Sequence, residues 1–451
     1  MKTFTLAAGV LAGSLLLAGC KPGSHQENIL PYTIHQHELA NGLKVVTVPF
    51  DSPGLAAFYL VVRTGSRNEV EPGVTGFAHF FEHMMFRGTD KYPNDKYNEV
   101  LKSTGASANA NTSMDRTVYH MTGNAARLET MFELESDRFM NLNYSEGDFK
   151  VEAGAVKGEY TKNYASPYSQ LYEATQNAAY DVHTYKHTTM GFYKDIEDMP
   201  NQFAYSKTFF DRYYRPEYTT IVVVGDVTPD NVNALAEKYF GTWKRGTHTD
   251  TIPVEPPQTG TRYVHVKNGS ILPVLSMNYK VAAFDEKKVD FPSYDIISSY
   301  AFGPTSDLYR KLVLEEQKVQ WIQAGAMDSR DPGLFGIMAS VFKPEDMQYV
   351  RDQITATLEK IKTEGLDPEK LKKTKSYLKY SYAMGIDNPD AIANSLCHYI
   401  SLTGDPEAVN RLYQQYEKTS IEDIKSVAST WFVETGLTIA TISAAEQGGV
   451  K

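Results

Sequence analysis

Residues 79–83 read His79-Phe80-Phe81-Glu82-His83, and the spacing of this stretch suggests both a local structure and a chemistry. Side chains four residues apart lie on one face of a helix, so the two imidazoles could bind the same metal ion. Glu82 would lie beside them and is suited to act as a base. The order H-x-x-E-H is the reverse of the more common H-E-x-x-H. The stretch therefore predicts the zinc helix of a metallopeptidase.

The flanking residues favour a buried helix. The run 75–78 can open a helix, and Gly88 can end it. Apolar side chains that could bury such a helix are Phe77, Phe80, Phe81, Met84 and Met85. The five-residue pattern alone arises by chance in about one or two of a hundred chains of this length, so it needs support from elsewhere in the sequence.

A third ligand must come from another segment, because a catalytic zinc ion has three protein ligands and one open position. Glu159 is the candidate, within a helix predicted over residues 146–164. Glu152 lies seven residues earlier, two turns away on the same helical face. Spacing alone leaves open the alternative that both are solvated helix glutamates.

The stretch 76–89, followed by Tyr92-Pro93, resembles the zinc helix of the pitrilysin family, which includes insulysin and mitochondrial processing peptidase. That family has a distal glutamate as its third ligand and a second glutamate seven residues before it. Glu159 and Glu152 fall on these two positions. The resemblance therefore implies one zinc ion per chain, with Glu159 as a ligand and Glu152 in a supporting role.

Three further segments extend the resemblance in the same order along the chain. They are residues 105–119, residues 183–185 with Gly191, and residues 213–216 leading to 224–226. The first resembles the family's substrate-binding strand. In it, Asn109, Ala110 and Asn111 would offer backbone groups to an extended peptide by strand addition at a sheet edge.

The resemblance implies a hydrolytic mechanism. Zinc held by His79, His83 and Glu159 would lower the pKa of its water toward about 7, and Glu82 would take the proton and later pass it to the departing amine. We expect Glu82→Gln to keep zinc and lose hydrolysis.

The chain departs from the family in its second half. Complete members carry an arginine and, seven residues later, a tyrosine that stabilise substrate and transition state, whereas alignment through residues 306–312 places Val313 and Gln320 there. Either Arg310 or Tyr309 compensates from a shifted register, or a homologous partner chain supplies the pair. We favour the partner, because some members divide the site in this way.

Other candidate residues are better explained by structure. His183 and His187 are four residues apart, but threonines around them disfavour a helix and the resembling family has a loop there. His120 is expected in a strand. Cys397 and His398 are adjacent and would point in different directions on a helix, so Cys397 is expected to be a buried apolar residue.

The N-terminus predicts the compartment. Lys2 precedes an apolar run at residues 4–18 that is short for a membrane span, so residues 1–19 are expected to be a signal peptide. Leu17-Ala18-Gly19-Cys20 resembles the bacterial lipoprotein box, which implies a lipidated Cys20 and a spacer over residues 20–30. Lys21 suggests sorting to the outer membrane. The alternative is an ordinary secretory cleavage site. With Cys20 lipidated, Cys397 could form no intrachain disulfide.

Length and composition suit a two-domain globular enzyme, with 451 residues of which 42% are hydrophobic. We expect an N-terminal zinc peptidase domain over residues 31–245, a linker rich in proline and glycine over 246–261, and a related C-terminal domain over 262–451. Strands are predicted at residues 44–48, 57–62, 219–224, 274–279 and 437–442, and a helix at 294–314. The fold class is α+β. The resemblance implies two homologous α/β sandwich domains with mostly antiparallel sheets, which pair with a second chain to form a clamshell chamber.

A net charge of −10 argues against nucleic-acid binding. The sequence therefore predicts a periplasmic, lipid-anchored zinc endopeptidase that cleaves small or unstructured peptides as the zinc-bearing subunit of a heterodimer. The alternative is a catalytically weak peptide-binding or assembly subunit of a related complex.

Overall fold

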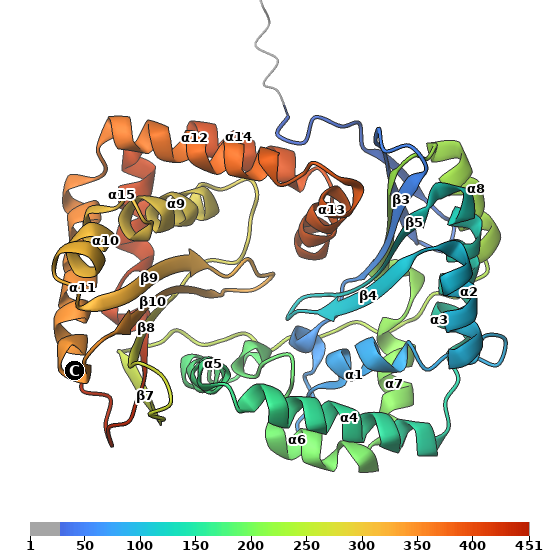
Figure 1. Ribbon diagram of the computed structural model, residues 1–451, viewed down its shortest axis with the longest axis horizontal. Coiled ribbons are helices and arrows are strands. Elements are labelled where there is room, and N and C mark those ends of the chain that lie inside the picture. Colours follow the sequence, from blue (N-terminus) through green and yellow to red (C-terminus); the bar gives the residue numbers. More distant parts are fainter. Residues whose placement is uncertain (1–27, 451) are drawn as a thin grey trace, which may run out of the picture.

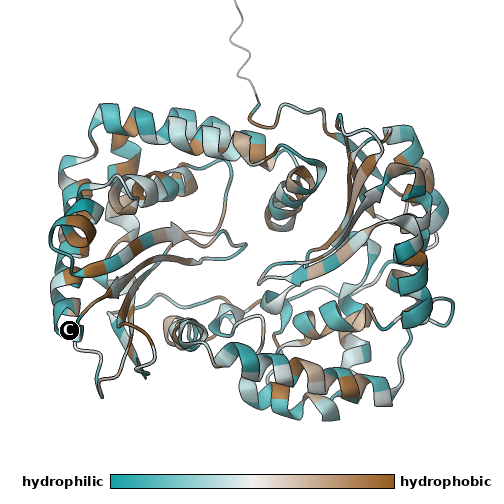
Figure 2. Cartoon of the chain, in the orientation of Figure 1, coloured by the Kyte–Doolittle hydropathy of each residue, from teal (hydrophilic) through white to brown (hydrophobic). Residues whose placement is uncertain are grey.

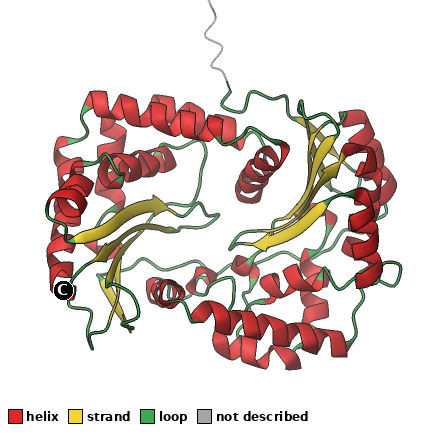
Figure 3. Ribbon diagram, viewed as in Figure 1, coloured by secondary structure: helices red, strands yellow, loops and turns green. Residues whose placement is uncertain are grey.

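The computed structural model describes residues 28–450, which form two α+β domains, each built on one sheet (Figure 1). The signal peptide and the lipidation site predicted at Cys20 lie outside the described residues. Helices surround both sheets, and the two sheets face each other across the molecule (Figure 3). Within the described residues, no helix is both long enough and apolar enough to cross a membrane.

The first sheet has six strands in the order β1-β2-β6-β3-β5-β4. Their bounds are β1 His35–Glu38, β2 Lys44–Pro49, β3 Leu55–Val62, β4 Ser107–Thr112, β5 Thr117–Asn124 and β6 Thr219–Gly225. Only β2 and β6 run parallel, and the other neighbours are antiparallel. β4 is therefore an edge strand, with one side of its backbone unpaired by any described strand.

The second sheet repeats this arrangement with five strands in the order β7-β11-β8-β10-β9. Their bounds are β7 Arg262–Lys267, β8 Val274–Lys280, β9 Val319–Ala326, β10 Leu334–Val341 and β11 Leu437–Ser443. Here β7 and β11 form the parallel pair. Apart from β1, the two sheets have the same topology, as expected for degenerate repeats. No helix or strand lies between residues 241 and 261, and β7 begins at Arg262.

The helices of the first half are α1 Phe77–Met84, α2 Asn94–Thr104, α3 Leu128–Asn141, α4 Glu146–Tyr164, α5 Pro167–Ala179, α6 Tyr193–Asp198, α7 Phe203–Tyr213 and α8 Pro229–Phe240. Those of the second half are α9 Asp290–Ile297, α10 Asp307–Tyr309, α11 Met347–Glu364, α12 Pro368–Met384, α13 Pro389–Thr403, α14 Ala408–Lys418 and α15 Ile421–Trp431. The helix predicted over residues 146–164 is confirmed.

Two helix predictions were wrong in their extent. α1 ends at Met84, and Gly88 instead lies in the following turn with φ +98° and a bridge to Pro93. The continuous helix predicted over residues 294–314 is broken at Gly303, whose backbone is extended. Pro304 explains this break, because the residue before a proline avoids the helical region. The helical turns resume at α10 and pass into a π-helical stretch, Arg310–Glu315.

One helix from each half of the chain packs against the sheet of the other half. α13 belongs to the second half of the chain but packs on the inner face of the first sheet, where its Ile392 and Leu396 join a core with Val61 and Val222 (Figure 1). α5 packs in return on the second sheet through Leu171. The strands of the first sheet carry many hydrophobic residues, whereas the outer helix α12 is mostly hydrophilic (Figure 2). This exchange of α5 and α13 between the two sheets buries apolar side chains of both domains in shared cores.

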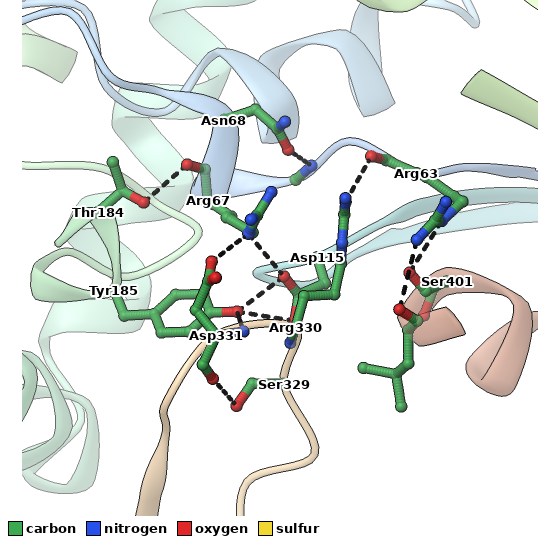
Figure 4. A network of polar contacts seen from close by, with 12 residues as sticks. Arg63, Arg67, Asn68, Asp115, Thr184, Tyr185, Ser329, Arg330, Asp331 and Ser401 are labelled. Carbon is green, nitrogen blue, oxygen red and sulfur yellow. Dashed lines mark hydrogen bonds and ion pairs between the residues drawn. The ribbon is translucent and has the colours of Figure 1, made fainter. Parts of the chain in front are cut away.

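A polar network also joins the domains through the loop between β9 and β10 (Figure 4). Arg67 forms ion pairs with Asp331 and with Asp115, the latter at 3.8 Å. Arg330 donates from Nη1 to the carbonyl oxygen of Arg63 at 3.1 Å. These contacts hold the loop against the turn that connects β4 with β5.

Candidate metal centre

The zinc-helix motif lies on α1, which is held in place by burial on one side and by a carboxylate at its start. Phe77, Phe80 and Phe81 are fully buried, and Phe81 stacks on Phe209 with ring centroids 5.5 Å apart. Glu69 accepts hydrogen bonds from the backbone N–H groups of residues 76 and 78, both at 2.7 Å. It thereby satisfies two of the donors that a helix N-terminus leaves unpaired.

Gly76 precedes α1 with φ +90°, a conformation that favours glycine. A Cβ at this position would lie 2.4 Å from Cδ1 of Ile196 and 2.9 Å from the carbonyl oxygen of Met190. The loop around residue 190 therefore packs directly against the start of the motif helix.

Three predicted ligands converge between α1 and α4. Nε2 of His83 lies 3.2 Å from Oε2 of Glu159, and Nε2 of His79 lies 3.7 Å from the same oxygen. All three ligand atoms lie within 4.8 Å of one another. Ligands about 2.0–2.1 Å from a tetrahedral zinc ion are separated by about 3.3 Å, so these residues fit that metal. Among residues 28–450, this is the one such cluster of three histidine, cysteine or acidic side chains.

The two imidazoles differ in their protonation. Burial, together with the neighbouring His83, lowers the pKa of His79 to about 4, so His79 is neutral at physiological pH. The hydrogen bond to Glu152 raises the pKa of His83, against the effect of its own burial. As the pH falls, His83 therefore takes up a proton before His79 does, and a metal must compete with that proton for His83.

Glu152 orients His83, as the resemblance implied for its position. Nδ1 of His83 donates to Oε1 of Glu152 at 3.0 Å, and Arg87 donates to the other carboxylate oxygen. This hydrogen bond places the proton on Nδ1 and leaves the Nε2 lone pair directed at Glu159. Burial would raise the pKa of Glu152, but the bonds from His83 and Arg87 outweigh it and lower the pKa.

Glu82 lies beside the ligand cluster and is held by a residue that sequence reasoning missed. The hydroxyl of Thr112 donates to Oε2 of Glu82 at 2.6 Å. Burial raises the pKa of Glu82, partly offset by this hydrogen bond and by His83. Thr112 directly follows the predicted substrate strand, so its place in the sequence was the one available signal. Arg87, the partner of Glu152, was within the quoted stretch, but its role was also missed.

Comparison with known proteins agrees with this geometry. The sequence model described as insulinase, peptidase family M16, matches residues 46–192, and a model described as peptidase M16 inactive domain matches residues 205–378. The chain belongs to peptidase family M16. The M16 assignment confirms the resemblance to the pitrilysin family.

Relatives of this M16 chain cover nearly its whole length. Zinc protease PqqE of Helicobacter pylori is 30% identical over 448 residues, which covers 96% of this chain and 98% of that protein. A crystal structure of a protease from Helicobacter pylori has a TM-score of 0.83 and 29% identity, covering 91% of this chain and all of that one. The periplasmic protease PqqL of Escherichia coli shares the fold, with a TM-score of 0.76 and 19% identity, over 93% of this chain and 48% of that one. The predicted α+β fold with two related domains is therefore confirmed.

A cavity of about 390 Å³ opens at the metal centre. His79, Glu82 and Glu159 line it together with Asn111 and Thr112 at the end of β4. A second cavity of about 370 Å³ lies on the other side of Glu82, where Asn109 and His83 form part of the wall. The unpaired edge of β4 therefore runs past the metal centre, with Glu82 between the two cavities. Of the three predicted substrate-binding residues, Ala110 is buried, whereas Asn109 and Asn111 on either side of it are exposed.

The other candidate residues lie apart from the metal centre. His183 begins a 3-10 turn and lies 3.1 Å from Asp331, and His187 packs against Phe192. His120 lies in β5 and stacks on Tyr59 with centroids 4.8 Å apart. Cys397 is fully buried, and burial raises its pKa to about 12. These positions are consistent with the prediction that His120, His183, His187 and Cys397 have structural roles and bind no catalytic metal.

The positions that replace the family's arginine and tyrosine lie in the second domain. Val313 packs against its hydrophobic core, and Gln320 lies in β9 near Ser340. Arg310 forms an ion pair with Asp307, and Tyr309 packs against the same core as Val313. Among the described residues, no arginine lines the cavity at His79 and Glu82.

Proposed function

We propose that this M16 chain is a zinc metalloendopeptidase that cleaves small or unstructured peptides. His79, His83 and Glu159 would hold one zinc ion, and Glu82 would act as the base. The observation that carries the proposal is the convergence of these three ligands beside Glu82, at a cavity next to the unpaired edge of β4. The names of the relatives as zinc proteases support the same chemistry.

Zinc bound there would polarise the scissile carbonyl and lower the pKa of a bound water to about 7. Glu82 would take a proton from the attacking water and later pass a proton to the leaving amine. Its buried position raises its pKa, which makes it a better base near neutral pH. Thr112 holds its carboxylate in place, and Glu152 keeps the proton of His83 on Nδ1.

Substrate would bind as an added strand along β4. Asn109, Ala110 and Asn111 would supply backbone hydrogen bonds to an extended peptide, so many sequences could be accepted. Because the cavities are on both sides of Glu82, side chains flanking the scissile bond would enter them.

A homologous partner subunit would complete the site by supplying an arginine and a tyrosine, and the two chains would enclose a clamshell chamber. Val313 and Gln320 cannot supply that charge or phenol, and Arg310 is already paired within its own helix. The match of this chain to about half of PqqL, a protein of twice its matched length, supports a two-part assembly.

We further propose that the chain is periplasmic, anchored by a lipid on Cys20 and sorted to the outer membrane. The description of PqqL as a periplasmic protease supports the compartment. Residues 31–245 would form the zinc peptidase domain and residues 262–451 the second domain, joined by the linker 246–261.

The alternative function is a catalytically weak peptide-binding or assembly subunit. The test is hydrolysis of a mixed library of unstructured peptides by the lipid-free chain, alone and with a homologous partner that carries the arginine and tyrosine. Zinc is quantified in every sample. We expect zinc in the chain by itself and cleavage in the mixture.

Glu82→Gln is the matched control, because it changes one carboxylate to an amide of the same shape. We expect it to keep zinc and to lose activity by about 10²–10⁴-fold, the contribution typical of a positioned base. Full activity of this variant with normal zinc would rule out Glu82 as the base. Bound zinc without cleavage, even with the partner, would favour the alternative function. Strong cleavage by the chain alone would remove the need for a partner.

A further inference from the structure

A further cavity of about 280 Å³ lies beside the metal cavity, between the two domains. Tyr172 and Thr189 line both cavities, so the two adjoin. The other walls of the second cavity are the turn at residues 113–116, the loop between β9 and β10, and α13. The turn directly follows β4. A peptide that pairs with β4 and continues past Thr112 would therefore reach this cavity.

Arg116 lines this cavity, and its guanidinium is without a partner. Its Nε and Nη1 atoms are buried and hydrogen bonded to nothing in the described part of the chain. No described acidic group forms an ion pair with it within 4.0 Å. Burial lowers the pKa of Arg116, with Asp115 acting in the opposite direction. Buried guanidinium nitrogens without an anion or a hydrogen bond are costly, so such atoms are normally paired.

Each neighbouring arginine has at least one partner for its guanidinium, which sets Arg116 apart. Arg67 pairs with Asp331, Arg330 donates to a backbone carbonyl, and Arg63 donates to the carbonyl oxygens of residues 401 and 402 (Figure 4). All of these contacts are made within the chain. Of these four arginines, Arg116 is the one with buried donors, Nε and Nη1, that lack a hydrogen bond in the described part of the chain.

The acidic groups of the cavity are already engaged. Asp115 accepts hydrogen bonds from the hydroxyl of Tyr185, at 2.8 Å, and from the backbone N–H of residue 330. Asp328 lies 2.9 Å from Nε2 of His398. Asp115 also lies 3.8 Å from Nε of Arg67. Both carboxylates of the cavity thus have partners of their own, whereas Arg116 has buried donors without one, and the fixed fork of a guanidinium matches a carboxylate.

We propose that Arg116 binds the carboxylate of an acidic residue in the peptide substrate, on the N-terminal side of the scissile bond. This inference rests on the proposed peptidase function. β4 runs toward the turn that holds Arg116, so a peptide antiparallel to β4 places its N-terminal portion there; antiparallel pairs are also the more common kind. The acidic residue would lie within about four residues of the scissile bond, since a strand advances ~3.3 Å per residue.

The test measures binding rather than cleavage, so that it does not depend on turnover. The zinc-loaded Glu82→Gln chain, with its homologous partner, is titrated into fluorescent unstructured peptides that carry glutamate or glutamine at one scanned position. Fluorescence anisotropy gives Kd. We expect one glutamate on the N-terminal side to bind at least about 10-fold more tightly than glutamine, as for a charge-assisted hydrogen bond.

Arg116→Gln in the same background should remove this preference, and Arg116→Lys should keep part of it. Arg127→Gln is the matched control, because Arg127 is exposed on the surface and the change in charge is the same. Thermal unfolding verifies that each variant is folded. If Arg116→Gln does not fold, the test uses Arg116→Lys and the effect of salt. The proposal then requires that the glutamate preference be reduced in Arg116→Lys and that it weaken as the salt concentration rises.

Several results would overturn the proposal: equal binding of glutamate and glutamine peptides, a preference unchanged in Arg116→Gln, a preference only on the C-terminal side, or no peptide binding at all. The proposed peptidase function fails separately, through absent cleavage by the wild-type pair in the presence of bound zinc. A preference that depends on Arg116 in a chain that does not cleave would leave the subsite in place and reassign the chain to peptide binding.

Discussion

The two domains have the same strand order, yet the helix that follows the second strand of the repeat differs completely between them. In the first domain that helix is α1, whose polar face carries His79, Glu82 and His83 toward two cavities that both include Glu82. In the second domain it is α9, in which nearly every residue is buried. One acidic residue of α9, Asp295, accepts a hydrogen bond from the hydroxyl of Tyr416 instead of facing other ligands. A shared topology therefore does not by itself create a metal centre; the polar face of one helix does.

The supporting contacts differ in the same way. α1 is flanked by α4, which brings Glu152 and Glu159 to the histidines, and by β4, which brings Thr112 to Glu82. Within α9, by contrast, burial and the nearby Asp328 raise the pKa of Asp295 to about 7. The pKa of Glu152, beside the metal ligands, is thus lowered by its partners, whereas the pKa of Asp295 in the second domain is raised by burial.

Removal of zinc should give the largest difference between the domains. A ligand present at 1,000 times its Kd stabilises the folded state by about 4 kcal/mol, and this stabilisation should act on the elements that hold it. We expect a chelator to increase amide hydrogen exchange in α1 and α4 and to leave α9 unchanged, as measured by mass spectrometry. Equal changes in α1 and α9 would show that the domains respond as one unit, through the exchanged helices α5 and α13.

Glu152→Gln should have the next largest effect. The amide loses the charge that accepts from His83 and Arg87, so zinc affinity should fall by about 10–100-fold, as for other residues that orient a metal ligand. Zinc titration against a competing chelator measures this change. Glu146→Gln is the control on the same helix, because Glu146 is exposed and forms a surface ion pair with Lys150. Unchanged zinc affinity in Glu152→Gln would mean that His83 is oriented by other contacts.

Asp295→Asn should have the smallest effect, on the pH dependence of stability. The folded state raises the pKa of Asp295 from about 3.9 to about 7, so it holds the proton more tightly than the unfolded chain does. The resulting stability is present below pH ~4 and is lost as the pH rises through about 7. We expect the variant to lose less unfolding free energy than the wild type between pH 5 and pH 8.

Urea unfolding at the two pH values measures this difference, and the variant should bind zinc as the wild type does. Glu369→Gln, at an exposed position of α12, should keep the wild-type slope. A steeper loss of stability in Asp295→Asn than in the wild type would contradict the assignment.

Much of the fold could be predicted because its signals are local. The strand at residues 219–224 is a continuous run of β-branched residues, and the structure has β6 at Thr219–Gly225. The helix at residues 146–164 has the capping pair Ser145 and Asp148 at its start. The helix predicted at residues 294–314 is interrupted at Gly303, because the following proline keeps that residue out of the helical region. Exchange of α5 and α13 between the sheets has no local signal, since it depends on contacts between distant segments.

The residue types and spacings that a metal site needs can be recognised from the sequence: two histidines one helical turn apart, a glutamate beside them, and two more glutamates on one face of a later helix. These depend on helical periodicity, which acts over a few residues. Which atoms come into contact depends on how the folded elements pack. The contacts of Glu82 with Thr112, of Glu152 with Arg87 and of Glu69 with the start of α1, and the solitary position of Arg116, arise where separate elements pack. Hydrogen bonds and charge burial act over a few ångströms in space, whatever the separation along the chain.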